Sequence, residues 1–438
     1  KRLSNGSFEK IDLYKEEEAK YKNLKKHVLK VDTRSWQEVL EEIRENAKNN
    51  KKVLVILNTI KKAEEIFEKV RDVPNLPTEL LHSEMTLKEK EERKKKIEYM
   101  LSKNNSNGCV VVSTQVIEAG MDIDADILYT ELCPMDVLVQ RMGRVLRRYK
   151  EKYDITKDHE ALKPNIILVI DRQDKKDKQG KEDKDKKYES GRGGVYDNEL
   201  LEKTLILLHR KVDFTVKNPN KQGVDKIWIW EEYYENFRHG EREEKLRKGK
   251  AEELIKETQI ELSEYEKYQL VESLYEALNP NGKYLSGFYN TLDVLDAGYM
   301  SDKREEAQEI FRRINNISTI HFLRFEELKE QIKKLIREEQ HLTYVSFKDS
   351  IIRNFVIQKQ FYKVPKERRK RLYFCLVNAK EQILGEVQGE TGISKDKMIR
   401  YEEKYEKIVE WSRDLFIVCE EGEEEEFKNC CCYRGNII

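Results

Sequence analysis

The stretch Val110–Arg148 constrains the fold of this chain more than any other part of the sequence. Its apolar run Cys109–Val112 is typical of a parallel strand that is buried on both faces. Thr114 and Gln115 follow at the carboxyl end of that strand, where an open α/β sheet places its ligands. The next residues can form one or two helical turns, which Gly120 can close in a left-handed conformation. The pattern therefore predicts a sheet with a polar loop at its working edge.

The second half of this stretch predicts an amphipathic helix. Its apolar stripe is formed by Leu138, Met142, Val145 and Leu146. Gln140, Arg144 and Arg147 recur at helical spacing on another face, so both arginines should project away from the core. Guanidinium groups one turn apart can bind the oxygens of a triphosphate in a bidentate way. A solvated basic surface is the alternative for such a pair.

The loop and the arginine segment together resemble motifs V and VI of superfamily 2 helicases. They are most similar to those of the CRISPR-associated helicase-nuclease of type I systems. The loop in that family has the form T-Q-V-x-E-x-G-x-D-x-D, which Thr114–Asp124 matches, and QRxGRxxR follows at Gln140–Arg147. The resemblance covers about residues 50 to 150 well and continues weakly to about 210.

The resemblance implies one half of an ATP site. Superfamily 2 motors hold ATP between two RecA-like domains, of which the second supplies arginines across the cleft. Arg144 and Arg147 would reach the γ-phosphate as catalytic residues, and Gln140, Gly120 and Asp122 would bind ATP, with Asp122 on the ribose. The chain has no GxxxxGK[ST] and no DEAD or DEAH box. We therefore expect it to be inactive in isolation, with Mg²⁺ ligands supplied by a missing N-terminal half and no metal site of its own.

The same resemblance implies a nucleic-acid track at the strand ends. The positions that match the strand-contacting motifs are Asn58, Thr59, His82, Ser83, Thr114 and Gln115. Hydroxyls and amides at such positions suit sequence-independent contacts with phosphates. Taken alone, His82 is more typical of a packed histidine, but its position in the motif set favours nucleic-acid contact. Glu84 stands where basic residues are common in the family, which argues against phosphate contact at that position.

Alternating strand and helix patterns predict the fold class, an α/β fold with a RecA-like parallel sheet and helices on both faces. Strands are expected at 52–57, 79–82, 109–112, 127–132 and 165–171, and capping boxes at Ser35–Glu38 and Thr86–Glu89. The predicted domains are a connector (1–30), the second RecA-like domain (31–172), a charged linker (173–195), a mainly helical region (196–340) and a smaller mixed α/β accessory domain (341–438). The accessory domain holds the strand-like segments TYVSF and FVIQKQF and the basic run Lys363–Arg371.

Length and composition set wider bounds. With 438 residues the chain exceeds one hydrophobic core, so two or three domains are expected. Lys plus Arg and Asp plus Glu number 84 each, so total charge does not decide whether nucleic acid is a partner. Scattered cysteines fit a reducing cytoplasm, and Cys430–Cys432 lacks zinc-site spacing. No apolar run is long enough for a membrane span. A first residue other than Met, with half of an ATP site missing, suggests a fragment.

The leading hypothesis is the C-terminal half of an ATP-dependent helicase that translocates on single-stranded DNA. Its partners would be the missing RecA-like domain and a CRISPR target-binding complex of the Cascade type. An HD nuclease domain, if present in the parent, would lie outside this chain, because no histidine here is followed by Asp. The alternatives are another superfamily 2 DNA or RNA helicase, or a catalytically silent module that binds nucleic acid. Asp122, Arg144 and Arg147 are all present, which argues against the silent module.

Overall fold

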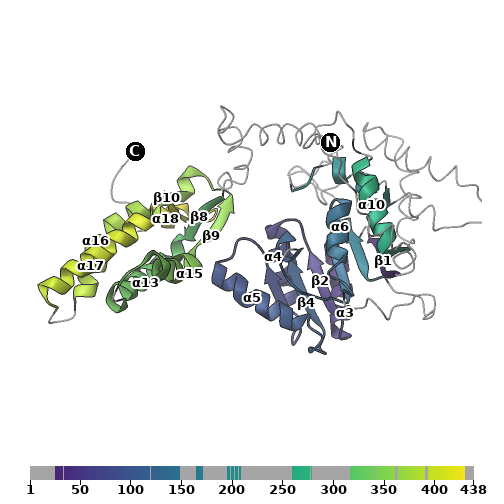
Figure 1. The fold of residues 1–438 in the computed structure, drawn as a ribbon, viewed down its shortest axis with the longest axis horizontal. Coiled ribbons are helices and arrows are strands. Elements are labelled where there is room, and N and C mark those ends of the chain that lie inside the picture. The colour runs from purple at the N-terminus through teal and green to yellow at the C-terminus, as the bar shows by residue number, and fades with distance from the viewer. Residues whose placement is uncertain are drawn as a thin grey trace, which may run out of the picture. The chain divides into compact units, whose positions relative to one another are not determined.

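The structure is a computed structural model that falls into two compact units (Figure 1). It describes residues 25–147, 164–170, 195–208, 259–278 and 316–429, except 33, 119, 198, 202, 206, 277, 340, 361–363 and 390–392. The first unit contains residues up to 82 and residues 95–289, and the second contains residues 83–94 and those from 290 onward. Within the described ranges, every helix is too short or too polar to cross a membrane.

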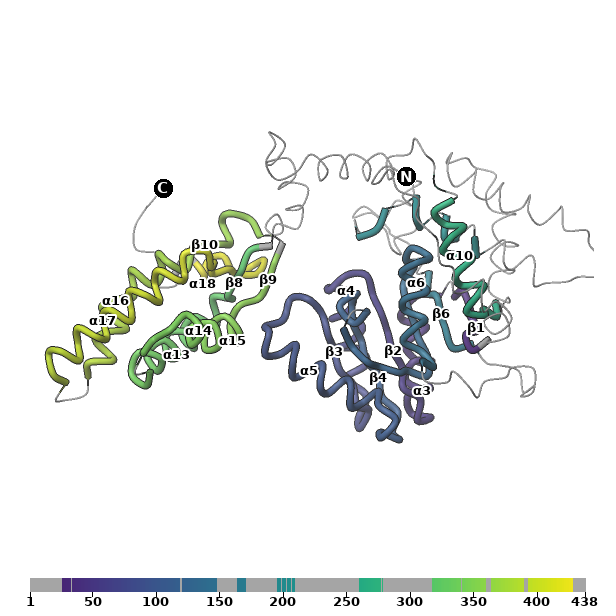
Figure 2. Tube along the Cα trace, viewed as in Figure 1, coloured from purple at the N-terminus to yellow at the C-terminus, as the bar shows by residue number. Residues whose placement is uncertain are grey.

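The first unit is built on a seven-stranded sheet with the order β3-β4-β2-β5-β6-β1-β7. Its strands are β1 (Lys25–Asp32), β2 (Lys52–Ile56), β3 (Thr78–Leu81), β4 (Cys109–Ser113), β5 (Ile127–Glu131), β6 (Ile166–Val169) and β7 (Gln259–Ser263). The first six strands run parallel, and β7 joins the edge antiparallel to β1. The predicted parallel sheet is therefore confirmed, and Figure 2 shows β2 and β4 side by side within it.

The helices of the first unit cover both faces of the sheet. They are α3 (Trp36–Lys48), α4 (Ile60–Arg71), α5 (Leu87–Met100), which begins among residues of the second unit, α6 (Met135–Met142) and α10 (Glu264–Glu276). The α3 and α4 helices pack against each other, as α6 and α10 do. The crossovers that contain α3 and α4 run along the sheet in one direction, and the crossover that contains α6 runs in the other. Right-handed connections therefore place α6, with α10 packed against it, on the face opposite α3 and α4. Both predicted capping boxes, at Ser35–Glu38 and Thr86–Glu89, are present.

The sheet is larger than the sequence predicted. We expected a connector up to residue 30, but β1 already begins at Lys25, and β7 comes from the region predicted to be mainly helical. The sequence did not predict β1 because this strand is rich in polar side chains. These side chains are buried by partners far along the chain. Lys267 donates to Nδ1 of His27 at 2.6 Å, and Nε2 of His27 donates to the Val145 carbonyl at 2.8 Å.

Lys267 predicts a pH dependence of stability. Burial lowers the pKa of Lys267 to about 8 from an ordinary 10.5, and Glu264 at 2.6 Å only partly opposes this. Between pH 8 and pH 10.5, Lys267 is protonated more often in the unfolded chain than in the folded chain. The free energy of unfolding should therefore rise with pH across this range. We expect the gain in the free energy of unfolding to be roughly 1–3 kcal/mol in the native protein and absent in Lys267→Met. Urea unfolding of both proteins across this pH range measures it, and parallel curves would contradict the assignment.

The second unit contains a four-stranded sheet, with the order β10-β11-β8-β9, beside a helical layer. The strands are β8 (Asn316–His321), β9 (Ile357–Gln360), β10 (Arg369–Arg371) and β11 (Leu415–Val418). The helices are α13 (Phe325–Glu338), α14 (Tyr344–Phe347), a π-helix (Lys348–Ile352), α15 (Arg353–Phe355), α16 (Leu372–Gln388), α17 (Lys395–Trp411) and α18 (Glu424–Asn429), with 3-10 turns at Phe322–Arg324 and Lys366–Arg368. The α13, α16 and α17 helices pack together around one apolar core.

Two strand predictions in this unit had different outcomes. FVIQKQF contains strand β9, as expected, but TYVSF was predicted wrongly, because Tyr344–Phe347 forms helix α14. A capping box explains the helix. The Thr343 hydroxyl accepts from the Ser346 amide, and the Ser346 hydroxyl bonds back to the Thr343 amide. This local N-cap outweighs the strand propensity of the β-branched and aromatic residues.

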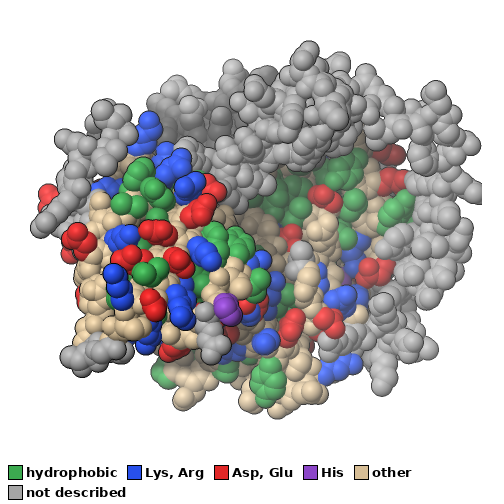
Figure 3. Space-filling model, turned by 60° about the vertical axis from the view of Figure 1, so that its left-hand side comes forward, with side chains coloured by type: hydrophobic (Ala, Val, Ile, Leu, Met, Phe, Trp, Pro, Cys, Tyr) green, Lys and Arg blue, Asp and Glu red, His purple; other side chains and the backbone are tan. Residues whose placement is uncertain are grey.

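The basic run of the second unit is occupied by contacts within the chain. Arg368 lies 3.3 Å from Glu424, Lys370 lies over the ring of Phe427, and Arg371 lies over Phe416. On the face drawn in Figure 3, Lys and Arg side chains are interspersed with Asp and Glu. Residues 173–194 of the predicted linker (173–195) and Cys430–Cys432 lie outside the described residues.

Candidate functional site

The carboxyl ends of the parallel strands bring the predicted polar residues to one edge of the sheet. Asn58 follows β2, His82 follows β3 and Thr114 follows β4. The Thr114 amide donates to the Leu81 carbonyl at 3.2 Å, and Nε2 of Gln115 donates to the Asn58 carbonyl at 3.1 Å. These bonds join the ends of three neighbouring strands, so the edge is one continuous surface.

Asn58 is buried and its side chain is engaged within the fold. Its Nδ2 donates to the Leu132 carbonyl at 2.8 Å, and its Oδ1 accepts from Arg141 at 3.1 Å. Its backbone amide donates to Glu131 at 2.6 Å. Asn58 therefore ties the end of β2 to the end of β5, which leaves its side chain little capacity for a ligand.

The other predicted nucleic-acid contacts differ in exposure. His82 and Thr114 are buried, and Nε2 of His82 lies 3.4 Å from Glu64. Thr59 is half-buried and caps helix α4, because its hydroxyl accepts from the Lys62 amide. Ser83 is exposed and Gln115 is half-buried. The predicted contacts of the first unit that solvent can reach at this edge are therefore Thr59 and Gln115, whereas Ser83 is counted in the second unit.

The loop after β4 has the conformation that the sequence predicted. A 3-10 helix spans Gln115–Glu118, and Gly120 is left-handed with φ of 73°. A Cβ at Gly120 would meet nothing within 4 Å, so the backbone angle rather than crowding favours glycine here. The exposed Asp122 follows this turn.

The arginine segment does not continue as the predicted helix. Helix α6 ends at Met142 with Gly143 as its C-cap, so Gln140 shares no helical face with Arg144 and Arg147. Beyond the helix, Val145 forms a parallel bridge with Ala125. The Ala125 amide donates to the Arg144 carbonyl at 2.9 Å, and the Leu146 amide donates to the Ala125 carbonyl at 3.0 Å. Pairing with a distant loop replaces the helical hydrogen bonds that the local periodicity favoured.

The Ala125 pairing nevertheless brings the predicted nucleotide residues together. Arg147 lies 3.0 Å from Asp122, and these side chains are 45% and 70% exposed. The Arg147 amide also donates to Asp124 at 2.8 Å, which fixes the backbone of the segment. Exposed ion pairs contribute only about 0–1 kcal/mol, so an anionic ligand can displace this one at little cost.

Arg144 holds the loop instead of projecting freely, which corrects the helical prediction. Its Nη1 donates to the Met121 carbonyl at 2.6 Å, and its Nη2 donates to the Glu118 carbonyl. The side chain therefore spans the Gly120 turn. It is half-buried, and this burial, followed by the charge of Arg147, lowers the pKa of Arg144.

Residues 49–150 match the sequence model of a family described as CRISPR-associated nuclease/helicase Cas3, C-terminal. We call this matched segment the Cas3-like domain. The putative CRISPR-associated nuclease/helicase Cas3 of Methanocaldococcus jannaschii is 32% identical over 146 residues, which is 32% of this chain and 20% of that protein. The CRISPR-associated endonuclease/helicase Cas3 of Escherichia coli K12 is 32% identical over 119 residues, 26% of this chain and 13% of that protein. The matched segment thus spans a fifth or less of these relatives.

The chain also aligns with the solved structure of T. fusca Cas3-ATP. It aligns with a TM-score of 0.36 at 18% identity, over 58% of this chain and 27% of that chain. Another structure, described as a CRISPR-associated protein, aligns with a TM-score of 0.40 at 19% identity, over 67% of this chain and 31% of that chain.

Arg141 belongs to the site of the Cas3-like domain, although the sequence did not predict a role for it. Its side chain is fully buried, and all five N–H donors face acceptors. The acceptors are Glu118 Oε1 (2.8 Å), Thr130 Oγ1 (2.7 Å), the Glu131 carbonyl (3.4 Å), Asn58 Oδ1 (3.1 Å) and the Tyr196 hydroxyl (3.0 Å). Arg141 lies three residues after Leu138, on the apolar face of the helix. This position could have predicted that its side chain is buried.

The described residues of the Cas3-like domain fit a nucleotide better than a metal ion. Within the described ranges, no group of three His, Cys, Asp or Glu side chains could hold a metal. Arg147 and Asp122 are accessible beside the Gly120 turn, where a guanidinium and a carboxylate suit phosphate and ribose oxygens.

Proposed function

We propose that residues 31–172 are the second RecA-like domain of an ATP-dependent helicase that translocates on single-stranded DNA in type I CRISPR antiviral interference. The observation that carries the proposal is the accessible Arg147–Asp122 pair, joined through one short loop to the polar strand ends. The nucleotide contacts and the nucleic-acid contacts of the motor would then both involve the same loop.

On the nucleotide side, Arg147 would supply the guanidinium that stabilises charge developing on the γ-phosphate. Arg144 would keep the loop in shape and turn its remaining N–H donors toward phosphate oxygens. Asp122 would accept a hydrogen bond from the ribose, beside the turn that Gly120 makes possible. Gln140 is exposed on α6 and would help to orient the nucleotide. The phosphate loop and the Mg²⁺ ligands would come from an N-terminal RecA-like domain, so this chain alone would not turn over ATP.

On the nucleic-acid side, Thr59, Ser83 and Gln115 are the accessible candidates. Hydroxyl and amide groups bind phosphate oxygens without reading bases, as a motor that moves along any sequence requires. Asn58, His82 and Thr114 would support this track through the backbone and through packing, because their side chains are buried. The relatives' names support a CRISPR setting and a nuclease domain as a partner. A target-binding complex of the Cascade type would be a further partner.

The chain is expected to bind single-stranded DNA weakly, with little dependence on sequence. If Z phosphates are neutralised, the logarithm of affinity should fall with the logarithm of salt concentration at a slope of roughly −0.7Z. Fluorescence anisotropy with labelled poly-dT and with a mixed sequence measures both properties. Gln115→Ala should weaken binding, whereas Gln140→Ala is the matched control and should not. No binding, strong sequence preference, or equal effects of the two variants would count against the proposal.

A further inference from the structure

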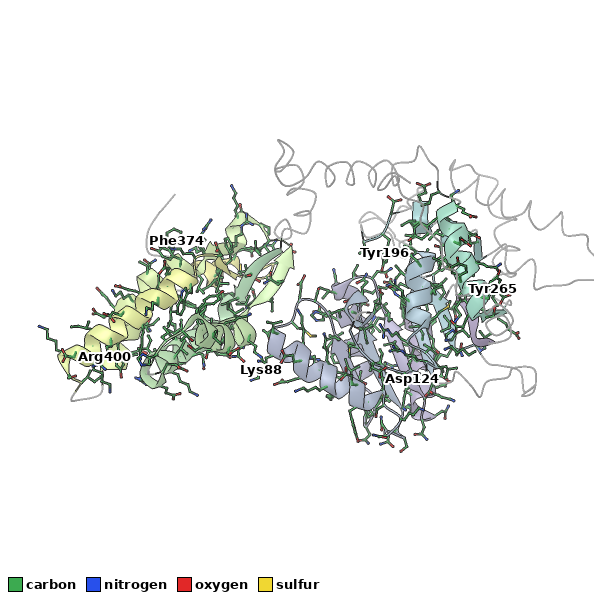
Figure 4. All side chains as sticks on the ribbon, in the orientation of Figure 1. Lys88, Asp124, Tyr196, Tyr265, Phe374 and Arg400 are labelled. Carbon is green, nitrogen blue, oxygen red and sulfur yellow. The ribbon has the colours of Figure 1, made fainter. Side chains whose placement is uncertain are left out.

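Tyr196 reaches the candidate site from outside the Cas3-like domain. It lies beyond residues 49–150 and is labelled in Figure 4 beside helix α6. Its hydroxyl accepts a hydrogen bond from Nη2 of Arg141 at 3.0 Å. A second hydrogen bond links the hydroxyl to the side chain of Gln115. Tyr196 therefore touches both the arginine-bearing helix and the loop after β4.

The Tyr196 hydroxyl is a neutral group with little spare capacity. The side chain is half-buried, and burial raises the pKa of Tyr196 to about 12 although Arg141 opposes this. A phenol has one donor and two acceptor positions, of which Arg141 and Gln115 use two. Phenylalanine would fill the same space but would remove both hydrogen bonds. It would leave one N–H of the fully buried Arg141 without its acceptor.

The contacts of Gln115 and Glu118 connect this hydroxyl to both sides of the proposed motor. Gln115 donates to the Asn58 carbonyl at the strand ends. One short turn later, the Glu118 carboxylate accepts from Arg141 at 2.8 Å, and the Glu118 carbonyl accepts from Arg144. A displacement of Gln115 would therefore shift a turn whose other end is held by the arginine segment.

We propose that Tyr196 is a positioning residue that holds Gln115 and Arg141 in one arrangement and so sets how the loop after β4 meets single-stranded DNA. This inference rests on the proposed function for its DNA component. Tyr196 would then act as a strut, a pair of contacts that couples the DNA edge to the nucleotide loop. The contacts that form the strut are present in the chain without DNA or nucleotide.

The first test measures the strut without any ligand, by hydrogen exchange and mass spectrometry on the whole chain. Tyr196→Phe should speed exchange of the amides in peptides that cover 113–121. Tyr275→Phe is a matched control, because the Tyr275 hydroxyl donates to Asp136 on α6 at 2.8 Å. It should leave exchange in that peptide unchanged. Unchanged exchange in Tyr196→Phe would overturn the proposal, whatever the chain binds.

The second test measures DNA affinity and thermal midpoint together. Tyr196→Phe should weaken poly-dT binding by about 2- to 10-fold, the range expected for one hydrogen bond. In a Gln115→Ala background it should weaken binding less than it does alone, because the contact between Tyr196 and Gln115 is already absent and only the hydrogen bond to Arg141 is lost. A lowered midpoint with unchanged affinity would make Tyr196 merely structural and overturn its DNA role. If the native chain binds no DNA, the proposed function fails, and the exchange result still decides the strut.

Discussion

Arg147→Ala in the complete two-domain protein is expected to lower DNA-stimulated ATP hydrolysis by about 100-fold or more. Removing one transition-state donor from a preorganised site typically has an effect of this size. The variant should keep its melting temperature, because Arg147 is 45% exposed and, among the described residues, its ion pair is with an exposed carboxylate. Steady-state ATPase rates with saturating DNA, measured beside thermal unfolding, separate these two effects.

Two further variants sharpen the Arg147 test. Arg147→Lys should restore little activity, since a point charge cannot reproduce the planar fork of donors. Arg71→Ala is a matched control, because Arg71 is an exposed arginine that also pairs with one exposed carboxylate, Glu68, at 2.6 Å. It should leave turnover unchanged. Normal turnover in Arg147→Ala, or a loss explained by unfolding alone, would remove Arg147 from the ATP site.

Arg144 is not interchangeable with Arg147 in this experiment. The sequence predicted that both arginines project away from the core, which would allow either to be truncated with little loss of stability, and the structure supports that expectation for Arg147 only. Arg144 donates to the carbonyls of Met121 and Glu118 across the Gly120 turn, so its loss would loosen the loop. A fall in activity in Arg144→Ala would therefore combine a structural and a catalytic effect.

Arg141→Met is expected to lower the free energy of unfolding of the first unit by about 3–5 kcal/mol, the range for breaking a buried charge network. Methionine fills part of the volume but leaves Glu118, Asn58 and Thr130 without their common donor. Arg141→Lys should also be strongly destabilising, because three donors on one nitrogen cannot serve acceptors around a planar fork.

Native-state hydrogen exchange in β4 and β5 measures the stability of the first unit without interference from the second. Arg147→Ala is the control, since it removes an arginine from the same motif at the surface. Exchange in Arg141→Met that matches the control would mean that the network contributes little. The double variant Arg141→Met with Glu118→Gln should recover part of the loss, because it no longer leaves a carboxylate unpaired.

Some features of the site followed from the sequence because they depend on neighbouring residues. The apolar run of β4, the left-handed Gly120 and the capping box at Ser35–Glu38 are each encoded within a few positions. The spacing of Thr114–Asp124 and Gln140–Arg147 indicated the family, which the matched segment 49–150 supports. The parallel sheet followed from the alternation of strands and helices.

Other features depended on partners far along the chain, and only the tertiary structure decided them. Helix α6 ends at Met142 because the next residues pair with Ala125, and β1 is a strand because β6, β7 and Lys267 cover its polar residues. Arg141 is a buried centre of the site because its acceptors, 10 to 83 residues away, converge on it. A sequence pattern records which donors and acceptors are present, but burial decides which of them must satisfy one another.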